Sequence, residues 1–205
     1  MEKLVFVFRR KAGLSRQEFH QHYVQNHSPL GLRLQQNLSG YTVNHLISEA
    51  EFDTVTEIWT PSARAFAGGG AQATPASDEI VADHVSFMGP QDSYVVEERI
   101  VRDGPLDPPL GQPGSRRKVV SFHAAGEPLP EPAGDAVRIV DNIVLEPLYL
   151  CDQRVEAGSP SKGDVALVRT AWFEEGTASG ETPANGVLVR EYRYRAPDGS
   201  GGQAG

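Results

Sequence analysis

The order of strand and helix patterns in the first hundred residues constrains the fold of this chain most. Residues 3–9 are β-branched and aromatic and predict a buried strand, and Ser15 with Glu18 has the capping-box spacing of a helix start. Three more strands are predicted at residues 41–47, 54–59 and 94–101, and a poorer helical stretch, broken by the glycines 68–70, is predicted at residues 63–87. The order strand, helix, strand, strand, helix, strand is typical of a ferredoxin-like unit, whose sheet carries helices on one face only. The other face must be buried against a partner.

The second half of the sequence supplies that partner. Residues 118–122 repeat the pattern of residues 3–7, and the final strand, 187–195, repeats that of residues 94–102. The two middle strands of this copy are predicted at 137–145 and 165–173, with Trp172 near the position of Trp59. A weak internal repeat accounts for these matches. The Pro/Gly-rich loops of the second copy indicate that it has lost most of its helices.

We therefore predict an α+β fold in which two fused ferredoxin-like halves form an intramolecular dimeric α/β barrel. Residues 1–101 form the half with the active pocket, and residues 102–116 form a Pro/Gly linker. Residues 117–195 form the degenerate half, and residues 196–205 form a disordered tail. The chain would then be a monomer with an internal pseudo-dimer, or a homodimer.

The first helix carries three of the six histidines. Its apolar stripe continues to Leu38, but Pro29 removes an amide and clashes with the preceding turn, so we expect a bend near His27. Ser28 and Pro29 could restart a second helical piece as its cap and first residue. Gly40 is expected to end the helix.

Charge and cysteine content exclude several classes of function. The formal net charge is -8 and the Lys/Arg runs are short, which argues against a nucleic-acid surface. The single cysteine, Cys151, cannot form an internal disulfide, and no apolar run is long enough for a signal peptide or a membrane span. We expect a soluble, cytoplasmic protein without a membrane partner.

The first hundred residues resemble the EthD-type family of dimeric α+β barrel proteins. The resemblance rests on segments that occur in the family order: 9–19, His22-Tyr23, His27-Ser28-Pro29-Leu30, Gly40-Tyr41, 52–59 and 82–87. Two positions depart from the family pattern, since Tyr23 replaces the usual tryptophan and His84 replaces a common acidic residue. The second half resembles the family only in strand order.

This resemblance implies two four-stranded sheets packed into a barrel, with a cavity between each sheet and its own helices. Relatives include small cofactor-free enzymes that dehydrate, decarboxylate or oxygenate polyketide and aromatic substrates. The resemblance therefore implies a small hydrophobic carbonyl or aromatic substrate and no cofactor.

His27 is the first candidate for chemistry, because it matches the family histidine and lies at the end of a helical segment. A histidine that titrates near neutrality can exchange a proton with a carbonyl or enol. The alternative is that its ring caps the broken helix within the core. Tyr23, one turn earlier, could orient a substrate oxygen or simply pack beside Phe19.

Glu57 is the third catalytic candidate, as a carboxylate between large apolar neighbours in a strand. Such a group either has a raised pKa or is paired, and structural pairing with an arginine across the barrel is the slightly favoured alternative. We expect the substrate-binding residues to be His20, His45, Trp59, Asp83, His84 and Phe87. An ordinary solvated surface is the alternative for His84.

Metal and nucleotide sites are not supported by the sequence. The histidines of the first helix lack the i, i+4 spacing of a helix-borne zinc site, and no phosphate-binding glycine loop joins a strand to a helix.

The sequence therefore favours a cofactor-independent lyase that dehydrates, decarboxylates or cleaves a carbon-carbon bond by proton transfer at His27. A cofactor-free monooxygenase and a non-catalytic ligand-binding barrel remain open, the latter favoured if aromatic side chains fill the pocket.

Overall fold

A computed structural model describes residues 1–68, 75–105, 112–128, 135–150, 154–155, 165–174 and 185–195. The strands are β1 (Glu2–Arg10), β2 (Gly40–Leu46), β3 (Thr54–Thr60), β4 (Met88–Arg102), β5 (Arg117–Ala124), β6 (Ala136–Pro147), β7 (Val165–Phe173) and β8 (Gly186–Arg195). The helices are α1 (Arg16–His22), the π-helical turn η1 (Tyr23–His27), α2 (Ser28–Leu34), α3 (Ala63–Phe66) and α4 (Pro75–Phe87). In the described part of the chain, every helix belongs to the first half.

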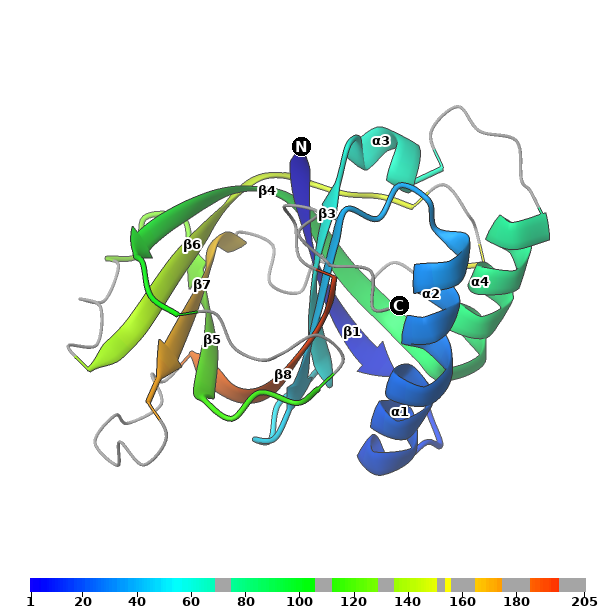
Figure 1. Ribbon diagram of the computed structural model, residues 1–205, viewed down its shortest axis with the longest axis horizontal. Coiled ribbons are helices and arrows are strands. Elements are labelled where there is room, and N and C mark those ends of the chain that lie inside the picture. The colour runs from blue at the N-terminus through cyan, green and yellow to red at the C-terminus, as the bar shows by residue number, and fades with distance from the viewer. Residues whose placement is uncertain are drawn as a thin grey trace, which may run out of the picture.

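The eight strands close into one antiparallel barrel in the order β1-β3-β2-β8-β5-β7-β6-β4. Each half keeps the ferredoxin-like order, with its first and third strands at the centre. The halves join at two seams, where β2 pairs with β8 and β4 pairs with β6. The predicted α+β fold of two fused ferredoxin-like halves is therefore confirmed. Figure 1 shows α1, α2 and α4 packed beside the first sheet, on the side away from β5, β6 and β7.

Alternating residues of each strand separate two layers of core. Val5 and Val7 of β1 point into the barrel, where they join valines of both halves. Leu4, Phe6 and Phe8 point the other way and pack against the helices. The barrel interior thus holds the two halves together, and a second, aromatic layer holds the helices on the first half.

The barrel interior also contains a pseudo-symmetric set of charges. Each half contributes a lysine, a glutamate paired with it and a tryptophan beneath it, namely Lys3, Glu98 and Trp59, and Lys118, Glu191 and Trp172. Glu57 lies between the lysines, with its carboxylate oxygens 2.8 Å from Lys3 Nζ and 2.9 Å from Lys118 Nζ. The internal repeat therefore extends from the strand order to these side chains.

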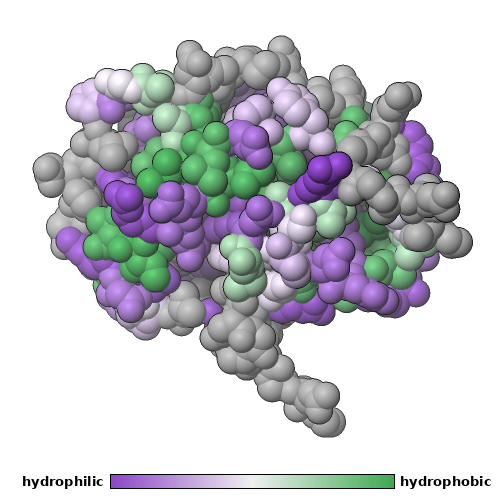
Figure 2. Space-filling model, turned by 90° about the horizontal axis from the view of Figure 1, so that it is seen from above, coloured by the Kyte–Doolittle hydropathy of each residue, from purple (hydrophilic) through white to green (hydrophobic). Residues whose placement is uncertain are grey.

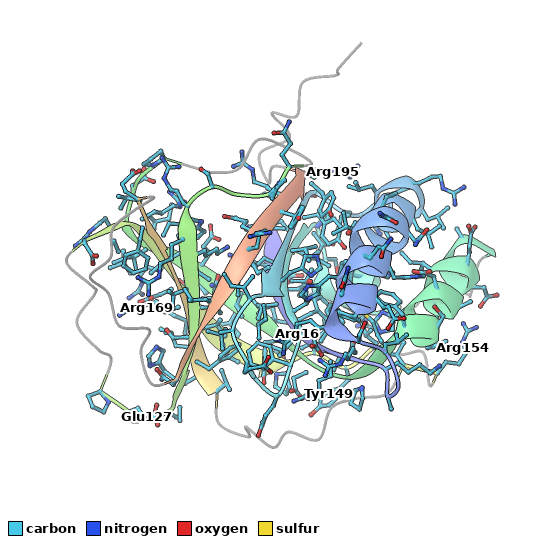
Figure 3. The ribbon with its side chains drawn as sticks, turned by 90° about the horizontal axis from the view of Figure 1, so that it is seen from below. Arg16, Glu127, Tyr149, Arg154, Arg169 and Arg195 are labelled. Atoms are coloured by element: carbon cyan, nitrogen blue, oxygen red, sulfur yellow. The ribbon has the colours of Figure 1, made fainter. Side chains whose placement is uncertain are left out.

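The outer face of the second sheet is more polar than its counterpart in the first half. Ser121 and His123 occupy the positions of Phe6 and Phe8, and they hydrogen-bond each other at 2.9 Å. Arg169 of β7 donates two hydrogen bonds to Asp141 of β6 on the same face, which lies away from the helices (Figure 3). These four polar side chains are buried and are satisfied by hydrogen bonds within the face.

The long first helix is broken as predicted, but by a π-helical turn. Ser15 and Glu18 form the expected capping box at its start. At the break, Ser28 N–H bonds the carbonyl of Tyr23 five residues earlier, and Pro29 then lies in the first turn of α2. The last helical residue is Leu34, so the helix ends before Gly40, which begins β2.

The segment between β3 and β4 agrees with the prediction in part. The helical stretch over residues 63–87, which was expected to be broken at the glycines 68–70, forms two helices, α3 and α4, with residues 69–74 between them outside the described part. Strand β4 begins at Met88, directly after α4 and six residues before the predicted start at Tyr94. The predicted disordered tail, Cys151 and residues 106–111 of the linker lie outside the described residues. In the described part, no helix is both long and apolar enough to span a membrane.

The exposed apolar side chains include Ile100, Val101 and Leu145. The view from above in Figure 2 shows apolar patches bordered by hydrophilic residues on the described surface.

Candidate functional site

The aspartate Asp83 of α4 bridges two histidines of the first helix. One carboxylate oxygen lies 2.7 Å from His27 Nδ1, and the other lies 2.8 Å from His22 Nε2. His27 is 8% exposed, whereas the side chain of His22 is 31% exposed. The carboxylate therefore connects a buried imidazole with one that reaches solvent.

The π-helical turn is the reason that both histidines reach the same carboxylate. In an α-helix, residues five apart lie on different faces, whereas in a π-helix residues i and i+5 are bonded across one turn. His22 and His27 are five residues apart; His22 directly precedes this turn and His27 is its last residue. His22 was not among the predicted site residues, because ideal α-helical geometry directs it away from His27.

The protonation of this trio follows from its hydrogen bonds. Burial opposes the charge of Asp83, but the hydrogen bonds from His27 and His22 outweigh it and lower its pKa. A carboxylate accepts hydrogen bonds only, so each histidine nitrogen facing it must carry a proton. In its neutral form His27 then has Nε2 unprotonated, and this nitrogen can act as a base.

Aromatic rings surround His27 on the helix side of the sheet. The ring centroids of Tyr23 and Phe87 lie 5.1 Å and 5.2 Å from that of His27, and His84 lies at 5.9 Å. Burial lowers the pKa of His84 to about 3, so the ring is neutral at pH 7, and its buried Nε2 has no hydrogen-bond partner. His84 is thus part of the site layer and is not a solvated surface residue.

A second pair of imidazoles, His20 and His45, lies on the other side of Tyr23. Their ring centroids are 4.3 Å apart, and His45 is 5.3 Å from Tyr23. His45 Nδ1 bonds the hydroxyl of Thr54 at 3.0 Å, while its buried Nε2 has no partner. Burial lowers the pKa of both rings, and that of His45 lies well below the ordinary value.

Five hydroxyl groups gather on this face of the sheet. Tyr23 bonds Thr56 at 2.8 Å, and Ser28 bonds Tyr41 at 3.2 Å. The ring of Tyr194, from β8 of the second half, stacks on Tyr41 with centroids 5.3 Å apart. Burial raises the pKa of all three tyrosines, so their hydroxyls remain protonated and can donate.

The structure brings most of the predicted site residues into this one layer. They are Tyr23, His27, His20, His45, Asp83, His84 and Phe87. Sequence reasoning missed His22, Ser28, Thr56 and Tyr194 as members of the layer, and considered Tyr41 only as a family match. Tyr194 could not have been found from local pattern, because it comes from the other half of the barrel.

Glu57 and Trp59 are not in this layer, since both point into the barrel interior. Burial opposes ionisation of Glu57, but Lys118 and Lys3 outweigh it and lower its pKa. Its partners are lysines and Asn44, where the structural alternative had named an arginine. The lowered pKa makes Glu57 a poor base, and its position separates it from His27 by the sheet itself.

The chemistry available in this layer is proton transfer and hydrogen bonding. His22, Asp83 and His27 face one another at hydrogen-bond distance, and within the described ranges no group of three or more His, Cys, Asp or Glu has the arrangement of a metal site.

Comparisons with known proteins identify a family match in the first half of the chain. Residues 11–91 match the model of the EthD domain, so the resemblance predicted from the sequence is confirmed for this segment. A crystal structure of a proposed monooxygenase from Lactobacillus acidophilus NCFM is similar, with 7% sequence identity, a TM-score of 0.49 and coverage of 96% of each chain. A search of curated proteins gave no matching sequence.

Proposed function

We propose that this chain, whose residues 11–91 form an EthD domain, is an enzyme that transfers protons at His27 on a small hydrophobic carbonyl compound. The reaction class is a cofactor-independent lyase, which dehydrates, decarboxylates or cleaves its substrate. An aromatic or polyketide-like skeleton suits the aromatic rings around His27.

The observation that carries this proposal is the bridge from Asp83 to both His27 and His22. It supports a base whose tautomer is fixed, because the carboxylate keeps the proton on His27 Nδ1 and leaves Nε2 unprotonated. The same carboxylate stabilises the imidazolium that forms when Nε2 takes a proton, as a buried aspartate does in other His–Asp pairs. His22, which is partly exposed, shares that carboxylate and can exchange protons with solvent.

In a dehydration, His27 Nε2 removes a proton from the carbon next to the substrate carbonyl, and an enolate forms. The electron pair of the broken C–H bond then forms the new double bond as a β-hydroxyl departs. The imidazolium returns its proton to that departing oxygen, so one water is released and His27 is neutral again. Positioned acid-base groups of this kind contribute roughly 10²–10⁴-fold in rate.

A non-catalytic barrel is the second candidate, and the packing of the helix-facing layer favours it. Phe8, Phe19 and Phe87 all lie within 6.2 Å of the Tyr23 ring, measured between centroids. A layer this densely filled with aromatic rings has less room for a substrate.

Deuterium exchange separates the two candidates. The probe is 2-tetralone in D₂O, followed by NMR, since loss of the proton next to its carbonyl needs no particular leaving group. We expect the wild-type protein to accelerate this exchange and Asp83→Asn to reduce it, while Asp78→Asn, an exposed aspartate on the same helix, leaves it unchanged.

Absence of exchange with the wild-type protein would support the non-catalytic barrel. An oxygen electrode run in parallel should detect no oxygen uptake. Uptake coupled to turnover would instead indicate a monooxygenase.

A further inference from the structure

The candidate site extends across the seam between the two halves. Tyr194 and Tyr192 of β8 lie beside β2, their ring centroids 6.4 Å apart. Tyr194 stacks on Tyr41, and Tyr192 meets His45 edge-on at 5.5 Å. The second half, which has no helices in its described residues, thus contributes aromatic side chains to the layer around His27.

The hydroxyl group of Tyr194 is buried and has no hydrogen-bond partner. Burial raises the pKa of Tyr194 and the nearby Ser28 hydroxyl lowers it, but the hydrogen bond of Ser28 goes to Tyr41, and the Tyr194 hydroxyl makes no hydrogen bond of normal geometry. The neighbouring phenols of Tyr23 and Tyr41 both have partners. Tyr194 is therefore the tyrosine of this group whose donor is free.

A free, buried O–H donor is unfavourable unless an acceptor meets it in the functional state. His45 Nε2, on the far side of Tyr192, is buried and unpartnered in the same way. Two unpartnered polar groups therefore border one aromatic surface at the seam. A flat, oxygenated ligand would suit this surface, because its ring can contact the tyrosines and its oxygen can accept a hydrogen bond from Tyr194.

We propose that Tyr194 binds the substrate and positions its carbonyl oxygen by donating a hydrogen bond from the phenol. This inference rests on the proposed function for the identity of the ligand as a carbonyl compound. It also makes the site composite, since the proton-transferring residues come from the first half and this oxygen-binding residue comes from the second.

The test compares two probes that share a carbon skeleton. 2-Tetralone has the carbonyl oxygen, and tetralin lacks it. Their dissociation constants for the full chain are measured by NMR titration with the wild-type protein, Tyr194→Phe and Tyr149→Phe. Tyr149→Phe is the matched control, because this tyrosine is 70% exposed (Figure 3).

We expect the wild-type protein to bind 2-tetralone more tightly than tetralin. Tyr194→Phe should weaken 2-tetralone binding about 3- to 10-fold, the usual worth of one hydrogen bond, and leave tetralin unchanged. The control should keep the wild-type preference. If Tyr194→Phe also keeps it, or if the wild-type protein binds neither probe, the assignment is overturned.

Binding and turnover separate this inference from the proposed function. Asp83→Asn should show reduced deuterium exchange and still prefer 2-tetralone. A wild-type protein without exchange, whose preference for 2-tetralone nevertheless depends on Tyr194, would overturn the lyase and uphold the role of Tyr194.

Discussion

Lys118 of the second half donates a hydrogen bond to Glu57 of the first, with 2.9 Å between Nζ and Oε1, in the interior of the barrel. Both side chains are almost fully buried, and Lys118 also pairs with Glu191 at 3.3 Å. Burial opposes the charge of Lys118, but the two carboxylates outweigh it and raise its pKa. This network joins the halves through charges that are costly to separate.

Replacement of Lys118 by methionine should therefore destabilise the protein strongly. It leaves two buried carboxylates with one fewer cation, and the loss of one partner of a buried pair costs about 3–5 kcal/mol. Urea unfolding followed by fluorescence measures the change. Arg33→Met is the matched control, since the exposed pair of Arg33 with Glu79 should contribute less than about 1 kcal/mol. Equal effects of the two substitutions would contradict the structural role of the network.

Loss of His27 should reduce turnover and have little effect on folding. We expect His27→Ala to lower the rate of deuterium exchange by about 10²-fold or more. The melting temperature should stay close to that of the wild-type protein. If the residue only caps the helix, the variant would instead lose about 1 kcal/mol of stability and keep its activity.

Acid should weaken the fold partly through His84. Burial lowers its pKa from an ordinary 6.5 to about 3, so below pH 6.5 the unfolded chain binds a proton that the folded protein does not. The free energy of unfolding should then fall as the pH drops from 6.5 toward 3, by up to about 1.4 kcal/mol per pH unit. His84→Phe should make this decline shallower in urea titrations at pH 7, 6 and 5. His20 and His45 shift in the same direction and should maintain part of the slope.

An isolated first half should not remain a folded monomer. A fragment of residues 1–104 would expose the interior face of its sheet, including Val5, Val7 and Val55, together with the unpaired edges of β2 and β4. At about 25 cal/mol per Å², several hundred Å² of apolar surface is worth on the order of 10 kcal/mol. Sedimentation should show self-association or aggregation at micromolar concentration. A cooperatively folding monomer would mean that the second half is an independent domain.

The strand order could be predicted because each strand has a strong local pattern and the second half repeats it. The predicted and observed bounds of β7 agree at both ends, and those of β8 differ by one residue. The face of β3 that meets the helices could not be predicted in the same way. Both Glu57 and Thr56 are buried, so polarity does not distinguish the barrel interior from the helix side. That ambiguity is the reason that Glu57 was expected beside His27.

The place of His22 beside Asp83 could not be predicted from the helical pattern of the sequence. An α-helix and a helix with one π-helical turn have nearly the same sequence pattern, yet they direct residues five apart differently. Asp83, the residue that makes His22 relevant, is sixty-one positions away in the chain. Contacts between distant segments of this kind follow from packing and are not encoded in local periodicity.

Because both halves belong to one chain, their sequences can diverge independently. When two identical subunits form such a barrel, a substitution enters both sheets at once, and both must tolerate it. Here Lys3 and Lys118 keep the same role inside the barrel, while Phe8 and His123 have diverged at corresponding outer positions. The first half can thus keep its helix layer, while the second, in its described residues, retains the strands and side chains that complete the shared interior.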